Sequence, residues 1–214
     1  MYKCILFDMD GTLVDSYDGI FHAYHYAFSS MGRTFPGKEF VKEAIGAPLP
    51  YAFLNLAGIE KKELPAFINR YREYYEEKGK REVRAYKGVE ECLKRLKRSD
   101  AFLGVATLKK EEFAAAILNE LGLFSYFDYV CGADQGDTLT KKDLIWQCME
   151  QFGCTFSQTI LVGDSIFDAK GAAQAGVDFL AVTYGFGFQE KESLHSYPVK
   201  YIASHPKEIL QKLL

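Results

Sequence analysis

Short apolar runs without a polar face recur along the chain. They occupy residues 4–7, 101–106, 129–131, 159–162 and 179–182. Strands that are covered on both faces of a parallel sheet show this pattern, because neither face meets water. Between the runs, apolar residues recur at helical spacing over residues 89–97, 111–121, 142–152 and 169–175. The alternation predicts an α/β fold with a doubly wound, Rossmann-like parallel sheet as its core.

One long segment, residues 16–82, breaks this alternation. Apolar positions recur at helical spacing over residues 17–31 and 61–78, a turn-rich break lies at residues 46–50, and no convincing strand is present. The simplest interpretation is an α-helical cap domain, residues 16–82, inserted into a core domain of residues 1–15 and 83–214. The cap would then lie above the edge of the sheet where the first strand ends.

Composition narrows the classes of partner. The net charge of −3 and the pI near 5.9 give no support for binding a nucleic acid polymer. The five cysteines form no Cys-x-x-Cys pair, which favours free thiols in a reducing compartment. No apolar run approaches the roughly 18 residues of a membrane span, and no signal peptide precedes the first strand. We therefore expect a cytoplasmic protein without membrane contact. A monomer or weak homodimer is the default expectation for its oligomeric state.

Polar side chains that could take part in catalysis follow several predicted strands. Asp8 and Asp10 follow the first strand and Thr107 the second, and Asp164 comes directly after another. Lys141 precedes the predicted helix over residues 142–152. Because the carboxyl ends of parallel strands share one edge of a sheet, we expect these residues to converge there.

The residue types in this set suit phosphoryl transfer. Clustered carboxylates with few imidazoles or thiols favour a hard cation, and Mg²⁺ suits a site that also holds phosphate. The Thr107 hydroxyl and the backbone N–H of Leu108 can hold phosphate oxygens, and Lys141 supplies a positive charge. One carboxylate can attack phosphorus, and a second one, two residues further on, can act as general acid and then as base.

These residues also resemble the motifs of a known family. Residues 8–16 (DMDGTLVDS) are similar to the first motif of the haloacid dehalogenase (HAD) superfamily of phosphohydrolases. Thr107 matches the second motif, Lys141 the third, and residues 163–168 (GDSIFD) the fourth. The glycines between residues 171 and 187 resemble the phosphoglycolate phosphatase-like branch. The resemblance covers essentially the whole chain, and residues 16–82 match the family's small α-helical cap.

The resemblance implies a role for each matched residue. Asp8 corresponds to the nucleophile and a Mg²⁺ ligand, and Asp10 to the acid/base that also offers its backbone carbonyl to the metal. Asp164 corresponds to the remaining carboxylate ligand, and Asp168 to a carboxylate that acts on the metal through water. The phosphate clamp would consist of Thr107, Leu108 and Lys141. Lys142 is the neighbouring alternative to Lys141, and the family pattern Lys-x-Asp-Leu favours Lys141. The carboxylate of Asp10 argues against carbon–halogen chemistry, because a halide leaving group needs no proton.

Some features have simpler explanations. His22 and His25, three residues apart on the first cap helix, fit a surface or packing role better than a metal site. The aromatic stripe of Tyr71, Tyr74 and Tyr75 is more typical of a core or cap surface than of a stacking platform. Ala47 stands where the family's cap loop usually has proline, so residues 46–49 are either a substrate loop or a plain turn.

The sequence therefore predicts a Mg²⁺-dependent phosphatase that acts on a small phosphorylated metabolite through an aspartyl-phosphate. Phosphoglycolate, a nucleoside monophosphate (a 5′-nucleotidase activity) and pyrophosphate stay open as substrates. A phosphotransferase resembling β-phosphoglucomutase would use the same aspartates but return the phosphoryl group to sugar. A non-catalytic binding protein is disfavoured, because each matched position keeps its reactive side chain.

Overall fold

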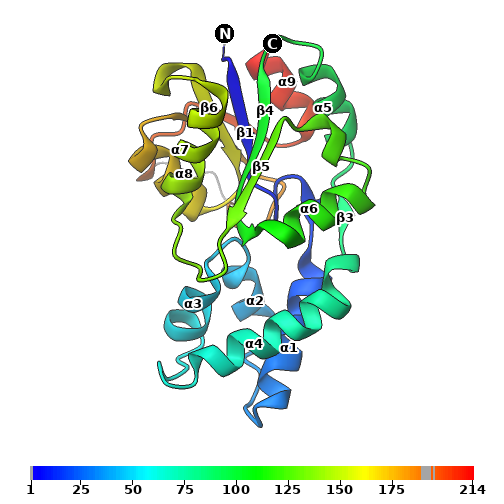
Figure 1. Ribbon diagram of the computed structural model, residues 1–214, viewed down its shortest axis with the longest axis vertical. Helices are drawn as coiled ribbons and strands as arrows, with labels where there is room; N and C mark the ends of the chain where they lie inside the picture. Colours follow the sequence, from blue (N-terminus) through cyan, green and yellow to red (C-terminus); the bar gives the residue numbers. More distant parts are fainter. Residues whose placement is uncertain (1, 189–193, 195) are drawn as a thin grey trace.

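The computed structural model describes residues 2–188, 194 and 196–214, and its core is a six-stranded parallel sheet (Figure 1). The strand order is β5-β4-β1-β6-β7-β8, so the first strand of the chain lies inside the sheet. The strands are β1 (Cys4–Phe7), β4 (Phe102–Lys110), β5 (Tyr129–Ala133), β6 (Thr159–Gly163), β7 (Asp178–Val182) and β8 (Tyr201–Ala203). The predicted α/β class with a doubly wound sheet is confirmed.

Helices cover both faces of the sheet. Helices α7 (Lys141–Phe152) and α8 (Ile166–Ala175) pack on one face, and α5 (Val89–Leu96), α6 (Glu111–Glu120) and α9 (Pro206–Leu213) on the other. Side chains alternate between the faces: Ile5 and Phe7 join one hydrophobic cluster, and Cys4 and Leu6 the other. Because both faces of β1 are buried, its sequence is apolar throughout.

The core differs from the sequence prediction at β4. This strand does not end before Thr107 but continues to Lys110, with a register shift between Ala106 and Lys110 that lets it pair again with Ala133 of β5. The irregular pairing lies among polar residues, where an apolar run cannot reveal it.

Other differences concern short elements. The edge strand β8 was not predicted, because a run of three apolar residues is too short to stand out; only Ala203 of this strand is buried. Helix α7 begins at Lys141, one residue earlier than expected, because Thr140 and Asp143 form a capping box. The core also contains the 3₁₀ turns η3 (Phe124–Tyr126) and η4 (Phe156–Gln158).

The segment between two very short strands is helical. Strands β2 (Val14–Asp15) and β3 (Arg84–Ala85) pair antiparallel, and Arg84 Nη2 lies 2.6 Å from Asp15 Oδ2. Between them lie α1 (Tyr17–Ser30), α2 (Lys38–Ala44), α3 (Leu49–Tyr51), the π-helical turn η1 (Ala52–Leu56), α4 (Leu64–Glu77) and the 3₁₀ turn η2 (Gly79–Arg81). Figure 1 shows these helices beyond the carboxyl ends of β4 and β5. The domain boundaries 1–15, 83–214 and 16–82 stay a prediction, and β2 and β3 lie at its two joints.

Aromatic side chains fill the interior of this helical part. Tyr24, Phe28, Phe53 and Phe67 are buried, and the rings of Phe28 and Phe67 meet edge to face with centroids 5.2 Å apart. His22 lies on the surface, with Nδ1 2.8 Å from a Glu82 carboxylate oxygen. This position agrees with the expected surface role of that histidine.

Two further expectations can be compared with the structure. All five cysteines lie within the described residues and are free. No helix in the described part of the chain combines the length and the apolar character that a membrane crossing requires.

Candidate active site

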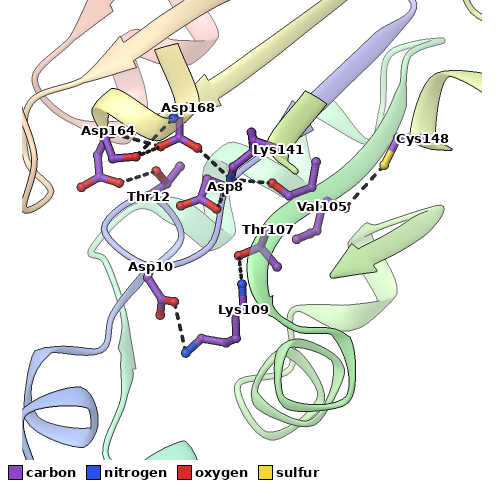
Figure 2. Close-up of polar contacts among 12 residues, drawn as sticks. Asp8, Asp10, Thr12, Val105, Thr107, Lys109, Lys141, Cys148, Asp164 and Asp168 are labelled. Carbon is purple, nitrogen blue, oxygen red and sulfur yellow. Dashed lines mark hydrogen bonds and ion pairs between the residues drawn. The ribbon is translucent and has the colours of Figure 1, made fainter. Parts of the chain in front are cut away.

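Three buried carboxylates meet where β1 and β6 end (Figure 2). One carboxylate oxygen from each of Asp8, Asp164 and Asp168 lies within 4.8 Å of the other two. Asp8 directly follows β1, Asp164 directly follows β6, and Asp168 lies in the first turn of α8. The expected convergence of strand ends therefore brings these three residues together.

In the part of the chain that the structure describes, one cationic side chain, that of Lys141, contacts the cluster of three carboxylates. Burial, followed by the nearby charge of Asp168, raises the pKa of Asp8 to about 7, although Lys141 opposes this shift. Burial and the charges of Asp168 and Asp8 also raise the pKa of Asp164 well above its ordinary value. Three buried oxygen donors that repel one another suit a hard divalent cation such as Mg²⁺. The residues present therefore fit the metal that the sequence predicts.

Lys141 enters this cluster, whereas Lys142 does not. Its Nζ lies 2.7 Å from Asp8 Oδ1 and 2.8 Å from Asp168 Oδ1, and it donates to the Ala106 carbonyl at 2.9 Å. The neighbouring Lys142 ammonium instead lies over the Trp146 ring, 4.6 Å from its centroid. Burial lowers the pKa of Lys141, but the carboxylates of Asp168 and Asp8 outweigh it, so the net shift is upward.

The loop after β1 and a loop after β7 hold Asp164 in place. Its carboxylate accepts hydrogen bonds from the backbone N–H groups of Phe186 at 2.8 Å and Gly187 at 3.2 Å, and from Thr12 Oγ1 at 3.4 Å. Gly11 makes this approach possible, because its φ is +81° and a Cβ there would lie 2.2 Å from Asp164 Oδ2. Backbone and glycine together fix this carboxylate.

Asp168 also serves as a helix cap. Its Oδ2 accepts hydrogen bonds from the backbone N–H of Ser165 at 3.0 Å and from Ser165 Oγ at 2.6 Å, which completes the capping box of α8. Its other oxygen faces Lys141. This Oδ1 forms an ion pair with Lys141 but is buried without a hydrogen-bond partner, so Asp168 is suited to orient Lys141 as well as to border the acidic cluster.

The Asp10 carboxylate points away from the acidic cluster, toward Lys109 (Figure 2). Asp10 Oδ2 lies 3.1 Å from Lys109 Nζ, and Asp10 Oδ1 is buried without a hydrogen-bond partner. Among the described residues, the cluster of carboxylates consists of Asp8, Asp164 and Asp168, and the Asp10 side chain is not part of it. The predicted metal contact of Asp10 runs through its backbone carbonyl and stays a prediction.

Thr107 and Leu108 line a cavity beside Asp8 and Asp10. Thr107 is buried, and its Oγ1 accepts a hydrogen bond from the backbone N–H of Lys109 at 3.2 Å. The cap closes the other side of this cavity with aromatic and loop residues, among them Tyr24, Gly46, Ala47, Leu49, Tyr71 and Tyr75. Of the two interpretations left open for residues 46–49, the structure therefore favours a loop that reaches the site.

Sequence reasoning missed three features of the site. Lys109 lies two residues after Thr107, and this spacing along one strand was a signal that could have identified it. Tyr75 was expected only in a core or on a surface, yet its hydroxyl accepts a hydrogen bond from Lys109 at 2.6 Å. Arg72 of α4 and Asp137 of the loop after β5 form an ion pair beside the cavity, and no sequence pattern links them.

Comparisons with known proteins agree with this architecture. A family model described as haloacid dehalogenase-like hydrolase matches residues 5–182. A 5′-nucleotidase from Pseudomonas aeruginosa is 32% identical over 94% of this chain and 91% of its own. A phosphoglycolate phosphatase from Pseudomonas syringae is 32% identical over 86% of this chain and 70% of its own. A crystal structure of a predicted phosphatase from Clostridium acetobutylicum has a TM-score of 0.94 at 32% identity and covers 100% of this chain and 98% of that one.

Proposed function

The chain belongs to the haloacid dehalogenase-like hydrolase family and is a phosphohydrolase, and we propose that it is a Mg²⁺-dependent phosphomonoesterase that works through an aspartyl-phosphate. The observation that carries this proposal is the contact of Asp8 with Lys141 beside the buried acidic cluster. A carboxylate that is held by a buried ammonium at the edge of a cavity is placed to act as a nucleophile.

In the first step, an oxygen of the Asp8 carboxylate attacks the phosphorus of the substrate. The bond from phosphorus to the ester oxygen breaks, its electron pair goes to that oxygen, and Asp10 delivers a proton there. The products of this step are the free alcohol and an aspartyl-phosphate at Asp8. Lys141 restrains the attacking carboxylate, and Thr107 with Leu108 holds the phosphoryl oxygens.

In the second step, water attacks the phosphorus of the aspartyl-phosphate. Asp10, now a carboxylate, removes a proton from the water, and the bond from phosphorus to the Asp8 oxygen breaks. Inorganic phosphate leaves, and Asp8 and Asp10 return to their starting forms. The cap residues around the cavity exclude bulk water from both steps.

Asp8, Asp164 and the backbone of Asp10 would hold the Mg²⁺ ion, with Asp168 behind them. When bound, the ion supplies positive charge that offsets the charge of the phosphoryl oxygens and of the buried carboxylates. Its affinity depends on ionised ligands, and the raised pKa of Asp8 and Asp164 makes that dependence strong.

The test is release of phosphate from p-nitrophenyl phosphate with and without Mg²⁺. Asp8→Asn keeps the size of the side chain but removes the nucleophile, and we expect it to lower kcat by about 10⁴-fold or more. Asp100→Asn, which changes an exposed carboxylate, is the matched control and should keep full activity. An Asp8→Asn variant that is folded and still active would exclude the covalent route.

For the substrate, we propose a small metabolite phosphomonoester of the phosphoglycolate type. A relative from Pseudomonas syringae that is named a phosphoglycolate phosphatase supports this choice. Lys109, Lys110 and Arg72 border the cavity, but each forms an ion pair with a carboxylate of this chain. The alternative is a nucleoside monophosphate, because one relative is named a 5′-nucleotidase and aromatic rings of Tyr24, Tyr71 and Tyr75 also border the cavity. Comparing kcat/KM across a panel that holds both classes distinguishes these proposals.

A further inference from the structure

The buried contact between Lys109 and Asp10 has no part in the mechanism described above. Lys109 lies near the end of β4, and its Nζ is 3.1 Å from Asp10 Oδ2. Their side chains are only 6% and 9% exposed, so little solvent screens the two charges. Burying an ammonium is costly unless it is paired, and Asp10 is the carboxylate that compensates Lys109.

A cap residue completes the surroundings of Lys109. The ammonium donates a hydrogen bond to the Tyr75 hydroxyl at 2.6 Å, and Nζ also lies 4.3 Å from the centroid of the same ring. Tyr75 is buried and belongs to α4 of the cap, whereas Lys109 and Asp10 belong to the core. Lys109 therefore links the cap directly to the proposed acid/base.

The two oxygens of Asp10 differ in their surroundings. Oδ2 is held by Lys109, whereas Oδ1 is buried and has no hydrogen-bond partner. Asp10, Lys109 and Tyr75 line the same cavity as Asp8 and Thr107, where the phosphoryl group would lie. Asp10 borders this cavity and its Oδ1 has no other hydrogen-bond partner, so Oδ1 is the carboxylate oxygen that is available to exchange a proton with a substrate atom.

We propose that Lys109 is a positioning residue: it holds Asp10 Oδ2 so that Oδ1 carries the transferred proton, and Tyr75 fixes Lys109 when the cap lies on the core. The inference rests on the proposed phosphatase function. It makes correct placement of the acid/base depend on a contact that an open cap would break. Burial lowers the pKa of Lys109, but Asp10 and Tyr75 outweigh it, so the ammonium keeps its charge.

The test compares two aryl phosphates of similar shape. Phenol is a poor leaving group with a pKa near 10, like tyrosine, and gains from a proton donor, whereas p-nitrophenolate leaves readily without one. The constant kcat/KM covers the first step only, so the later role of Asp10 as a base does not enter. We expect Lys109→Met to lower kcat/KM for phenyl phosphate by about 10²-fold and for p-nitrophenyl phosphate by less than about tenfold.

Milder variants separate positioning from a structural role. Lys109→Arg keeps the charge and should recover part of the lost phenyl phosphate activity. Tyr75→Phe keeps the ring but removes the hydroxyl, and we expect a selective loss for phenyl phosphate of about fivefold, the effect of one hydrogen bond. Tyr74→Phe, the neighbour whose hydroxyl contacts Glu82 instead, is the matched control and should leave the ratio of the two substrates unchanged.

Each outcome decides one part of the proposal. An equal loss on both substrates would show that Lys109 holds the phosphoryl group or the fold, and would overturn the positioning role. A selective loss for phenyl phosphate in Lys109→Met but not in Tyr75→Phe would support the positioning role of Lys109 and would exclude a role of the cap residue Tyr75. If Lys109→Met does not fold, Lys109→Arg and Tyr75→Phe decide the question. Wild-type protein that hydrolyses neither substrate would overturn the phosphatase proposal itself.

Discussion

At the scale of single residues, Gly11 shows how closely the backbone must approach the acidic cluster. Its φ of +81° is strained for other residues, and a Cβ there would lie 2.2 Å from Asp164 Oδ2. We expect Gly11→Ala to displace Asp164, to lower the free energy of unfolding by about 2–4 kcal/mol and to weaken Mg²⁺ binding. Thermal unfolding with and without Mg²⁺ measures both effects.

Gly122→Ala is the matched control for Gly11→Ala. Gly122 also has a positive φ, +70°, but no atom lies within 4 Å of its hypothetical Cβ. Gly122→Ala should lower the free energy of unfolding by about 1–2 kcal/mol, the backbone strain alone, and should leave Mg²⁺ binding unchanged. An equal decrease in the free energy of unfolding for the two variants would mean that the surrounding structure adjusts to remove the clash with Asp164.

The raised pKa of Asp8 and Asp164 predicts how stability depends on pH. Between the ordinary carboxyl pKa near 3.8 and the raised value near 7 for Asp8, the folded state binds more protons than the unfolded state. The free energy of unfolding of metal-free protein should therefore fall as pH rises through this range. The proposed Mg²⁺ ion would bind the ionised carboxylates, so Mg²⁺ should raise Tm more at about pH 8 than at about pH 5.

Asp164→Asn tests the origin of this pH dependence. The variant lacks one of the two titrating carboxylates, so its Tm without metal should fall less steeply with pH. It should also lose most of the Mg²⁺ effect, because one ligand is gone. A pH dependence identical to that of the wild type would place the proton uptake elsewhere in the protein.

At the scale of elements, the pattern of apolar positions predicted those parts of the site that depend on strand ends. Asp8 and Asp164 follow buried strands that can be recognised from three or four consecutive apolar residues, and a parallel sheet brings such ends together. The end of β4 could not be located in this way, because its last residues are polar and its pairing shifts register. Lys109 lies in that part of β4, which explains why it was missed.

Helix α7 shows how a cap positions a side chain of the site. Thr140 accepts a hydrogen bond from the backbone N–H of Asp143, and Lys141 is the first residue of the helix. We expect Thr140→Ala to lower the free energy of unfolding by about 1 kcal/mol and also to lower kcat, because the backbone that carries Lys141 loses a restraint. Chemical denaturation and steady-state kinetics measure the two effects.

Thr155 offers a comparison away from the site. It caps the short turn η4 with the same kind of capping box, formed with Gln158. Thr155→Ala should lower stability but should leave kcat unchanged. If both variants lose stability and neither loses activity, the cap of α7 does not contribute to the placement of Lys141.

At the scale of the whole molecule, the site is completed by contacts between the cap and the core. Lys109 contacts Tyr75, which lies 34 residues earlier in the sequence. Arg72 contacts Asp137, which lies 65 residues later. Single charged or aromatic residues on amphipathic helices give no signal for a partner at such a distance, so sequence patterns could predict that a cap exists but not how it contacts the core. Only the folded arrangement shows which cap residues border the cavity.

The Arg72–Asp137 pair is the clearest ionic contact between cap and core. Arg72 Nη2 lies 2.7 Å from both oxygens of Asp137, and the side chains are 20% and 13% exposed. Asp137 adopts a φ of +52°, which is uncommon for a residue other than glycine. We expect Arg72→Met and Asp137→Asn each to favour the open cap and to raise KM for p-nitrophenyl phosphate by about five- to thirtyfold, equivalent to about 1–2 kcal/mol.

A double-mutant cycle separates this ion pair from direct binding of substrate. If the two residues act through each other, the double variant Arg72→Met/Asp137→Asn should have a KM close to that of either single variant. If each contacts substrate on its own, the two effects on the free energy of binding should add. Arg33→Met is the matched control, because it removes an ion pair with Glu63 inside the cap, and its KM should equal that of the wild type. A change of similar size in Arg33→Met would mean that stability of the cap, rather than its closure on the core, governs KM.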